Sequence, residues 1–147
     1  MIAITDLILA VSNLMGAPSL GTVCYVQAVL QEVGDISGIL WVCSVSWTIN
    51  QITKLDRTPT KMEQQALFYK MNAVIWITTA IVTLLPLSTS SYGAAEGWCW
   101  IKGHKTADVL WRYFCFYLPI WIAVVYMVVV YAKVFKVQNG VMLRVSS

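Results

Sequence analysis

The sequence predicts an all-α transmembrane helical bundle, because its composition is typical of a protein whose main solvent is lipid. Of the 147 residues, 59% are hydrophobic and 12% are charged, and the mean hydropathy is +0.69. Soluble domains are about 45–50% apolar and about 25% charged. Because a membrane-spanning helix needs about 20 apolar residues, the chain has room for about four or five crossings and for no soluble catalytic domain. The net charge of +3 gives no support for a nucleic-acid partner.

Four apolar blocks, each bounded by turn or charge signals, are the expected membrane spans. They cover approximately residues 1–16, 20–53, 71–87 and 109–137. The first block is several residues short of a full crossing and starts at the first residue. We therefore expect residues 1–147 to form a single but incomplete transmembrane domain.

Helix breakers and caps separate these blocks. Residues 16–19 read Gly-Ala-Pro-Ser, and a glycine can end one helix where the proline cannot continue it. The first two helices are therefore expected to be antiparallel neighbours. Thr60 and Glu63 fit a capping box, which predicts that a helix restarts near Lys61. Pro119 lies inside the fourth block and is expected to kink its helix and open a local cavity.

The distribution of basic residues predicts the orientation. The loop from 54 to 70 and the C-terminal tail carry most of the Lys and Arg residues, whereas the segment 88–108 and its border carry Lys102, Lys105 and Arg112. By the positive-inside tendency, the loop and both chain ends are expected to be cytoplasmic, with residues 88–108 outside. The expected location is the plasma membrane, with lipid as a partner.

The four cysteines divide into two pairs under this topology. Only Cys24 and Cys99 both lie on the oxidising side, so the compartment permits a disulfide between them, although two unpaired cysteines are the alternative. Cys43 and Cys115 lie in apolar stretches and are expected to act as small buried hydrophobes. His104 has no partner at metal-ligand spacing, and no catalytic or phosphate-binding motif is present. Neither an enzyme nor a metal or cofactor site is predicted.

Two acidic residues are the most costly side chains in the expected spans. Glu32 and Asp35 are three residues apart and share one helical face, and acids inside a span usually mark a ligand or ion path. Two acids this close are not expected to be ionised together, so one is protonated or paired with a cation, for which Arg112 or Lys102 is available. The alternative is a hydrogen-bonded carboxyl that only fixes helix packing. Asp6 is either a similar polar core site or a water-facing residue.

Several motifs in a fixed order resemble the cAMP-receptor-like seven-helix receptors of slime moulds and plants. The most specific is Gly97-Trp98-Cys99-Trp100 followed by Tyr117-Leu118-Pro119-Ile120-Trp121. Supporting motifs are Thr5-Asp6-Leu7, Gly16-Ala17-Pro18-Ser19, Cys24-Tyr25-Val26-Gln27, Gly38-Ile39-Leu40-Trp41 and the polar stretch 44–50. The resemblance implies that the chain covers helices two to five of a seven-helix receptor fold.

The resemblance also implies a G-protein-coupled receptor with a Cys24–Cys99 disulfide, an extracellular small-molecule pocket and a heterotrimeric G protein as partner. cAMP is one candidate ligand. Together with the cation argument above, the expected ligand-binding residues are Gln31, Glu32, Asp35, Trp100, Lys102 and Arg112. By position, the residues expected to contact the G protein are Lys54, Leu55, Asp56 and Arg57.

Other classes of protein fit the same sequence. A four-helix ion or proton carrier would use Glu32 and Asp35 as a relay. A membrane scaffold would bind no ligand and would not signal. Receptors of this type that are fused to a cytoplasmic lipid-kinase domain form a further possibility. The sequence leaves the ligand, the G-protein subtype and the oligomeric state open.

Overall fold

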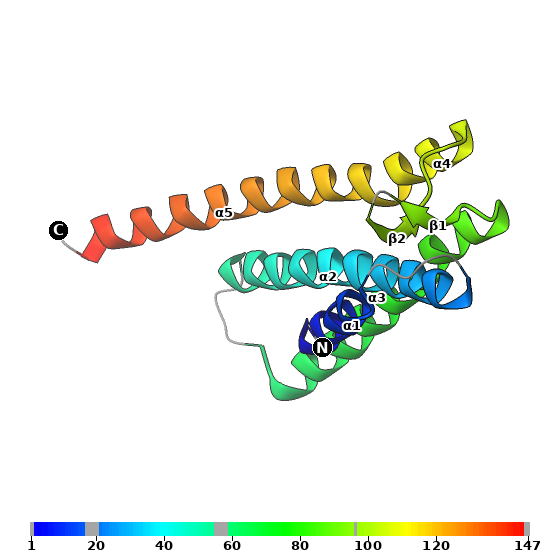
Figure 1. The fold of residues 1–147 in the computed structure, drawn as a ribbon. Coiled ribbons are helices and arrows are strands. Elements are labelled where there is room, and N and C mark those ends of the chain that lie inside the picture. The colour runs from blue at the N-terminus through cyan, green and yellow to red at the C-terminus, as the bar shows by residue number, and fades with distance from the viewer. Residues whose placement is uncertain (1, 17–20, 55–58, 96, 146–147) are drawn as a thin grey trace.

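Helices form most of the computed structural model, which describes residues 2–16, 21–54, 59–95 and 97–145 (Figure 1). Its elements, in chain order, are α1 (Ile2–Leu14), α2 (Thr22–Lys54), α3 (Lys61–Ser88), β1 (Tyr92–Ala95), β2 (Trp98–Ile101), α4 (Thr106–Trp111), the π-helical segment η1 (Arg112–Tyr117) and α5 (Leu118–Val145).

Three of the described helical segments are long and apolar enough to cross a membrane. They comprise Thr22–Thr53, Lys61–Ser88 and Thr106–Asn139, the last running through α4, η1 and α5. With 13 residues, α1 is about 20 Å long, which is less than the hydrocarbon core of about 30 Å. The predicted class, a helical membrane bundle, is confirmed.

The central element of the bundle is α2. It contacts α1, α3 and α5, and it also packs against both strands. Figure 1 shows α5 on one side of α2, with α1 and α3 on the opposite side and the strands near the start of α2. We call the end of α2 at Thr22 the hairpin end, and the end that reaches Lys54 the Lys54 end.

The capping box predicted at the start of α3 is present. The hydroxyl of Thr60 accepts a hydrogen bond from the Glu63 N–H at 3.3 Å, and the Glu63 carboxylate accepts one from the Thr60 N–H at 2.8 Å. These two bonds satisfy backbone donors that a helix start leaves without partners. The helix consequently begins at Lys61, ten residues before the apolar block expected from residue 71.

A β-hairpin in the segment between α3 and α4 was not predicted. Its two strands are antiparallel, with Tyr92 opposite Ile101 and Ala95 opposite Trp98. Gly97 supports the turn with a φ of +104°, a conformation that a glycine adopts without strain. Four-residue strands are too short to give a clear alternating pattern, and their inner faces are buried by packing against α2.

The helix before Pro119 contains a π-helical turn. A proline lacks the N–H that would donate to the carbonyl of Cys115, four residues earlier. Just ahead of it, the Leu118 N–H donates to the carbonyl of Tyr113, five residues earlier. Such π turns are rare, and those found inside α-helices often occur at functional sites. The departure from α-helical hydrogen bonding therefore lies in residues 112–117. The kink expected at Pro119 itself stays a prediction.

Close packing of α1 on α2 depends on Gly34. A Cβ atom added at this position would lie 2.5 Å from the Cγ of Leu9, closer than two carbon atoms can approach. The other glycine of the same helix, Gly38, has no heavy atom within 4 Å of such a Cβ. Of these two glycines, which are four residues apart, only Gly34 is required for the close contact between α1 and α2.

Substitution of these two glycines tests this packing. We expect Gly34→Leu to lower the free energy of unfolding by about 1–3 kcal/mol, because the added side chain overpacks the contact with Leu9. Gly38→Leu, the matched control, should be neutral or slightly stabilising since leucine favours a helix. Unfolding in mixed detergent micelles, followed by circular dichroism, measures both. Equal destabilisation by the two variants would contradict the assignment.

Candidate functional site

A disulfide bond between Cys24 and Cys99 fastens the hairpin to α2. It joins the first turn of α2 to the middle of β2, with a Cα–Cα distance of 5.2 Å across 75 residues of sequence. Both residues are 2% exposed and belong to the core cluster at the hairpin end. The Cys24–Cys99 disulfide, which the predicted topology permits, is therefore present.

The side chain of Gln27 joins three elements one turn below this disulfide. Its Oε1 accepts a hydrogen bond from the Cys99 N–H at 3.3 Å. Its Nε2 donates to the carbonyl of Ser12 at 3.0 Å and to that of Gly16 at 2.7 Å. Ser12 is in the last turn of α1, where its carbonyl also accepts from the Met15 N–H at 3.2 Å, and Gly16 follows the end of this helix. Gln27 was not predicted as a site residue. The feature of the sequence that could have indicated it is its position three residues after Cys24, on the same face of the helix.

Beneath the hairpin, a buried hydrogen bond joins Trp100 to Glu32. The indole Nε1 of Trp100 donates to Oε2 of Glu32 at 2.7 Å. Glu32 is 0% exposed and Trp100 is 8% exposed. The ring of Trp100 packs edge-on against Phe116, and the guanidinium carbon of Arg112 lies 5.5 Å from the ring centroid. Trp100 of the hairpin and Glu32 of α2, both predicted to bind ligand, are thus in direct contact with each other and buried.

The cations considered for the acids are engaged elsewhere. Arg112 donates from Nε to the carbonyl of Ile101 at 2.8 Å, and Lys102 donates from Nζ to the carbonyl of Ser90 at 3.0 Å. Within the part of the chain that the structure describes, Oε1 of Glu32 is buried and has no hydrogen-bond partner. The structure therefore brings an indole, rather than Arg112 or Lys102, to Glu32.

A second polar group lies where α1 meets α2. Ser12 donates to Oε1 of Gln31 at 3.2 Å, and Nε2 of Gln31 donates to Oδ2 of Asp35 at 3.2 Å. Asp35 is half-buried, so its carboxylate is more accessible than that of Glu32. Asp6 is exposed on α1. Of the predicted ligand residues, Gln31 and Asp35 are hydrogen-bonded to each other.

Tyr92 fixes the other strand of the hairpin to the end of α3. Its hydroxyl donates to the carbonyl of Thr83 at 3.0 Å, and its ring packs edge-on against Tyr25 of α2. Burial raises the pKa of Tyr92 above its ordinary value, because the charged phenolate would lose its hydration. The hydroxyl consequently stays protonated, and able to donate this bond, throughout the physiological pH range.

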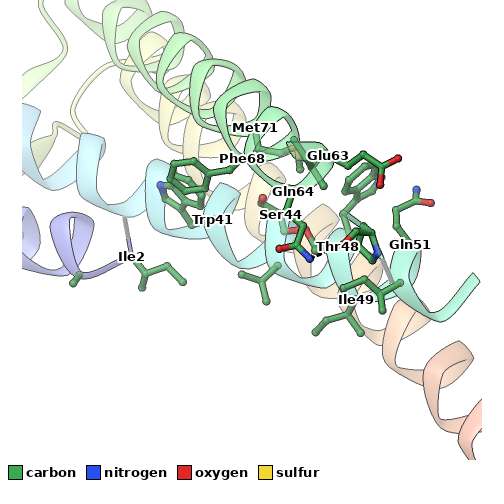
Figure 2. Close-up of a pocket in the computed structure, with 16 residues that line it drawn as sticks. Ile2, Trp41, Ser44, Thr48, Ile49, Gln51, Glu63, Gln64, Phe68 and Met71 are labelled. Atoms are coloured by element: carbon green, nitrogen blue, oxygen red, sulfur yellow. Dashed lines mark hydrogen bonds between the residues drawn. The ribbon is translucent and has the colours of Figure 1, made fainter. Parts of the chain in front are cut away.

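The Lys54 end contrasts with this packed end because it contains a cavity of about 1030 Å³. Side chains of α1, α2 and α3 line it, including Trp41, Thr48, Gln64 and Phe68 (Figure 2). Lys54, the first of the predicted G-protein contacts, is the last residue of α2. The other three, Leu55, Asp56 and Arg57, lie outside the described residues.

This geometry defines a polytopic helical membrane protein with a disulfide-linked hairpin at one end and a cavity at the other. Comparison with known proteins gives a consistent result. Residues 2–143 match the family described as slime mold cyclic AMP receptor. A similar protein is "G-protein coupled receptor 1" of Arabidopsis thaliana, with 24% identity over 140 residues.

The chain belongs to the slime mold cyclic AMP receptor family, since the match covers nearly all of it. The resemblance stated from the sequence motifs is thereby confirmed. The alignment with the Arabidopsis protein covers 95% of this chain and 41% of that protein. The chain therefore spans less than half the length of this relative.

Removal of the disulfide tests its role in holding the hairpin. We expect Cys24→Ser to lower the free energy of unfolding by about 2–4 kcal/mol, because the unfolded chain loses a cross-link over a long loop. Cys43→Ser, at a half-buried free cysteine of the same helix, is the control and should have a small effect. Non-reducing mass mapping of the native chain should recover the Cys24–Cys99 peptide pair. Alkylation of both thiols without prior reduction would contradict the assignment.

Two substitutions of Glu32 separate hydrogen bonding from packing. In Glu32→Leu the indole N–H of Trp100 stays buried without an acceptor, which costs about 1–3 kcal/mol. Glu32→Gln keeps an acceptor oxygen and should retain most of this stability. Hydrogen exchange measured by mass spectrometry should show faster exchange of residues 92–101 in the leucine variant alone. Equal protection in both variants would show that the hydrogen bond does not hold the hairpin.

Proposed function

We propose that this chain is the ligand-binding and coupling part of a G-protein-coupled receptor of the cyclic AMP receptor family, with its hairpin end outside the cell. A ligand would bind at the hairpin end, and a heterotrimeric G protein would bind near residues 54–57. The observation that carries the proposal is the connection of the hairpin to the central helix α2 through a disulfide and two buried side-chain hydrogen bonds.

The proposed ligand site lies around the residues of the hairpin end that remain partly accessible. Arg112 and Lys102 are half-buried beside the hairpin, and Gln31 and Asp35 are half-buried where α1 meets α2, whereas Trp100 and Glu32 are buried. Arg112 holds one hydrogen bond through Nε, so its terminal nitrogens can donate to an anion. A negatively charged ligand such as cAMP suits this pair of cations. A ligand that reaches Trp100 would have to displace the hairpin.

The proposed mechanism is a shift between two arrangements of the helices. A ligand biases such an equilibrium only by the difference in its affinity for the two states. Because Trp100 and Gln27 connect the hairpin to α2, a movement of the hairpin alters contacts along this helix. The same helix ends at Lys54, where the proposed G-protein contacts begin. A single rigid element would thus carry the signal between the two ends.

Binding and nucleotide exchange test this function. With the chain expressed in its full reading frame in membranes, we expect saturable binding of labelled cAMP and faster loading of a GTP analogue on added heterotrimer. Arg112→Gln should weaken cAMP binding roughly tenfold or more, since hydrogen bonds to charged groups contribute about 1.5–3 kcal/mol. Lys105→Gln, an equal change of charge at an exposed residue of the same segment, is the control, and Arg112→Lys should be intermediate.

Two results would contradict the proposal. Proton flux into liposomes that depends on pH and is abolished by Asp35→Asn would favour the carrier instead. Saturable cAMP binding that Arg112→Gln and Lys105→Gln weaken equally would remove Arg112 from the site.

A further inference from the structure

The cavity at the Lys54 end differs chemically along its length. Its α2 wall runs from Trp41 to Ile52, a distance of about 16 Å along the helix axis. Trp41, Phe68 and Met71 lie at the end nearer the middle of the bundle, whereas Gln51 and Glu63 lie at the opposite end (Figure 2). The cavity is therefore apolar at one end and polar at the other, which is the pattern that an amphiphile requires.

The apolar end presents a broad aromatic surface. The rings of Trp41 and Phe68 have centroids 6.1 Å apart, and their planes are inclined by only 31°. Trp41 is 6% exposed and so has a fixed environment, whereas Phe68 is 43% exposed. Leu67 and Val45 also line the cavity. A rigid, flat apolar body makes contact with such a surface at a small cost in conformational entropy.

Among the described side chains that line the polar end, several are hydrogen-bond acceptors and none is a Lys or Arg. The amide nitrogen of Gln64 donates to the carbonyl of Pro59 at 3.1 Å, so its carbonyl oxygen can accept a bond from a ligand. The hydroxyl of Thr48 donates to the carbonyl of Ser44 at 2.9 Å, and its lone pairs can accept likewise. A hydroxyl head would find acceptors at both side chains.

The cavity lies between helices that are expected to cross the membrane. Most of its lining residues belong to α2 and α3, both of which are long and apolar enough to span a membrane. Its volume of about 1030 Å³ is at the upper end of the range for small-molecule sites, about 300–1,000 Å³.

We propose that this cavity binds an uncharged, flat lipid of the sterol class, with its ring system on Trp41 and Phe68 and its hydroxyl at Thr48 and Gln64. The bound lipid fills the space between α1, α2 and α3. It lies apart from the ligand site at the hairpin end and does not depend on the proposed receptor function.

Photolabelling of the full chain in lipid nanodiscs tests the site. The probe is a cholesterol analogue that carries a diazirine on its ring system, and labelled positions are mapped by mass spectrometry. We expect label on residues 41–52 and 59–71, with competition by unlabelled cholesterol and none by phosphatidylserine at the same mole fraction. Competition by phosphatidylserine alone would show that the cavity prefers a charged phospholipid, and would overturn the proposal.

Variants of α3 provide the controls. Leu67→Trp fills the cavity and should reduce labelling about tenfold, which corresponds to about 1.4 kcal/mol. Gln64→Leu removes an acceptor with little change of volume and should also reduce it. Ile77→Trp, on a 61% exposed position of the same helix outside the cavity, should leave labelling unchanged. Circular dichroism and recovery of the Cys24–Cys99 peptide pair verify that each variant is folded.

Three results would overturn the proposal. Uniform labelling of lipid-facing positions that Leu67→Trp does not reduce would indicate an annular contact. Equal labelling of folded Leu67→Trp and wild type would place the lipid elsewhere. Displacement of the probe by heterotrimeric G protein without any competition by cholesterol would assign the cavity to a protein partner.

Discussion

The arrangement of this protein depends on the need to satisfy polar groups inside a lipid environment. Where no water is available, a backbone or side-chain donor that finds no acceptor costs several kcal/mol. At the hairpin end, the side chain of Gln27 meets this need for two parts of the chain at once, since it binds carbonyls in and just after the last turn of α1 and the backbone of β2. Glu32 does the same for the indole of Trp100.

These contacts make the two ends of the bundle physically different. The hairpin end is fixed by a disulfide and by buried hydrogen bonds between groups far apart in the sequence. At the Lys54 end, the side chains of α1, α2 and α3 leave a cavity between them, and a local capping box, rather than a tertiary contact, starts α3. Because α2 reaches both ends, it is the element through which a change at the hairpin can be transmitted to residues near Lys54.

Membership of the slime mold cyclic AMP receptor family gives these features a functional context. Two residues of the motif Trp-Cys-Trp connect β2 to α2. The cysteine forms the disulfide with Cys24, and the tryptophan after it, Trp100, donates a hydrogen bond to the carboxylate of Glu32. In the same strand, Trp98 is 58% exposed. Residues two apart in a strand share a face, so the different exposure of the two tryptophans reflects their places along the strand: Trp98 begins β2, whereas Trp100 packs over α2.

The sequence by itself determined the helical membrane class and the capping box at Thr60, because hydropathy and local backbone donors are properties of composition or of short segments. It permitted a disulfide between Cys24 and Cys99, and the tertiary structure decided that this pair forms. Only the tertiary structure decided that Trp100 meets Glu32, that Gln27 joins three elements and that a hairpin precedes α4. The partners in these hydrogen bonds are up to 72 residues apart, and no local pattern specifies which face of α2 the hairpin covers. The same reason explains why sequence analysis assigned Arg112 and Lys102 as possible partners of the acids, although their nearest acceptors are carbonyls of their own loop.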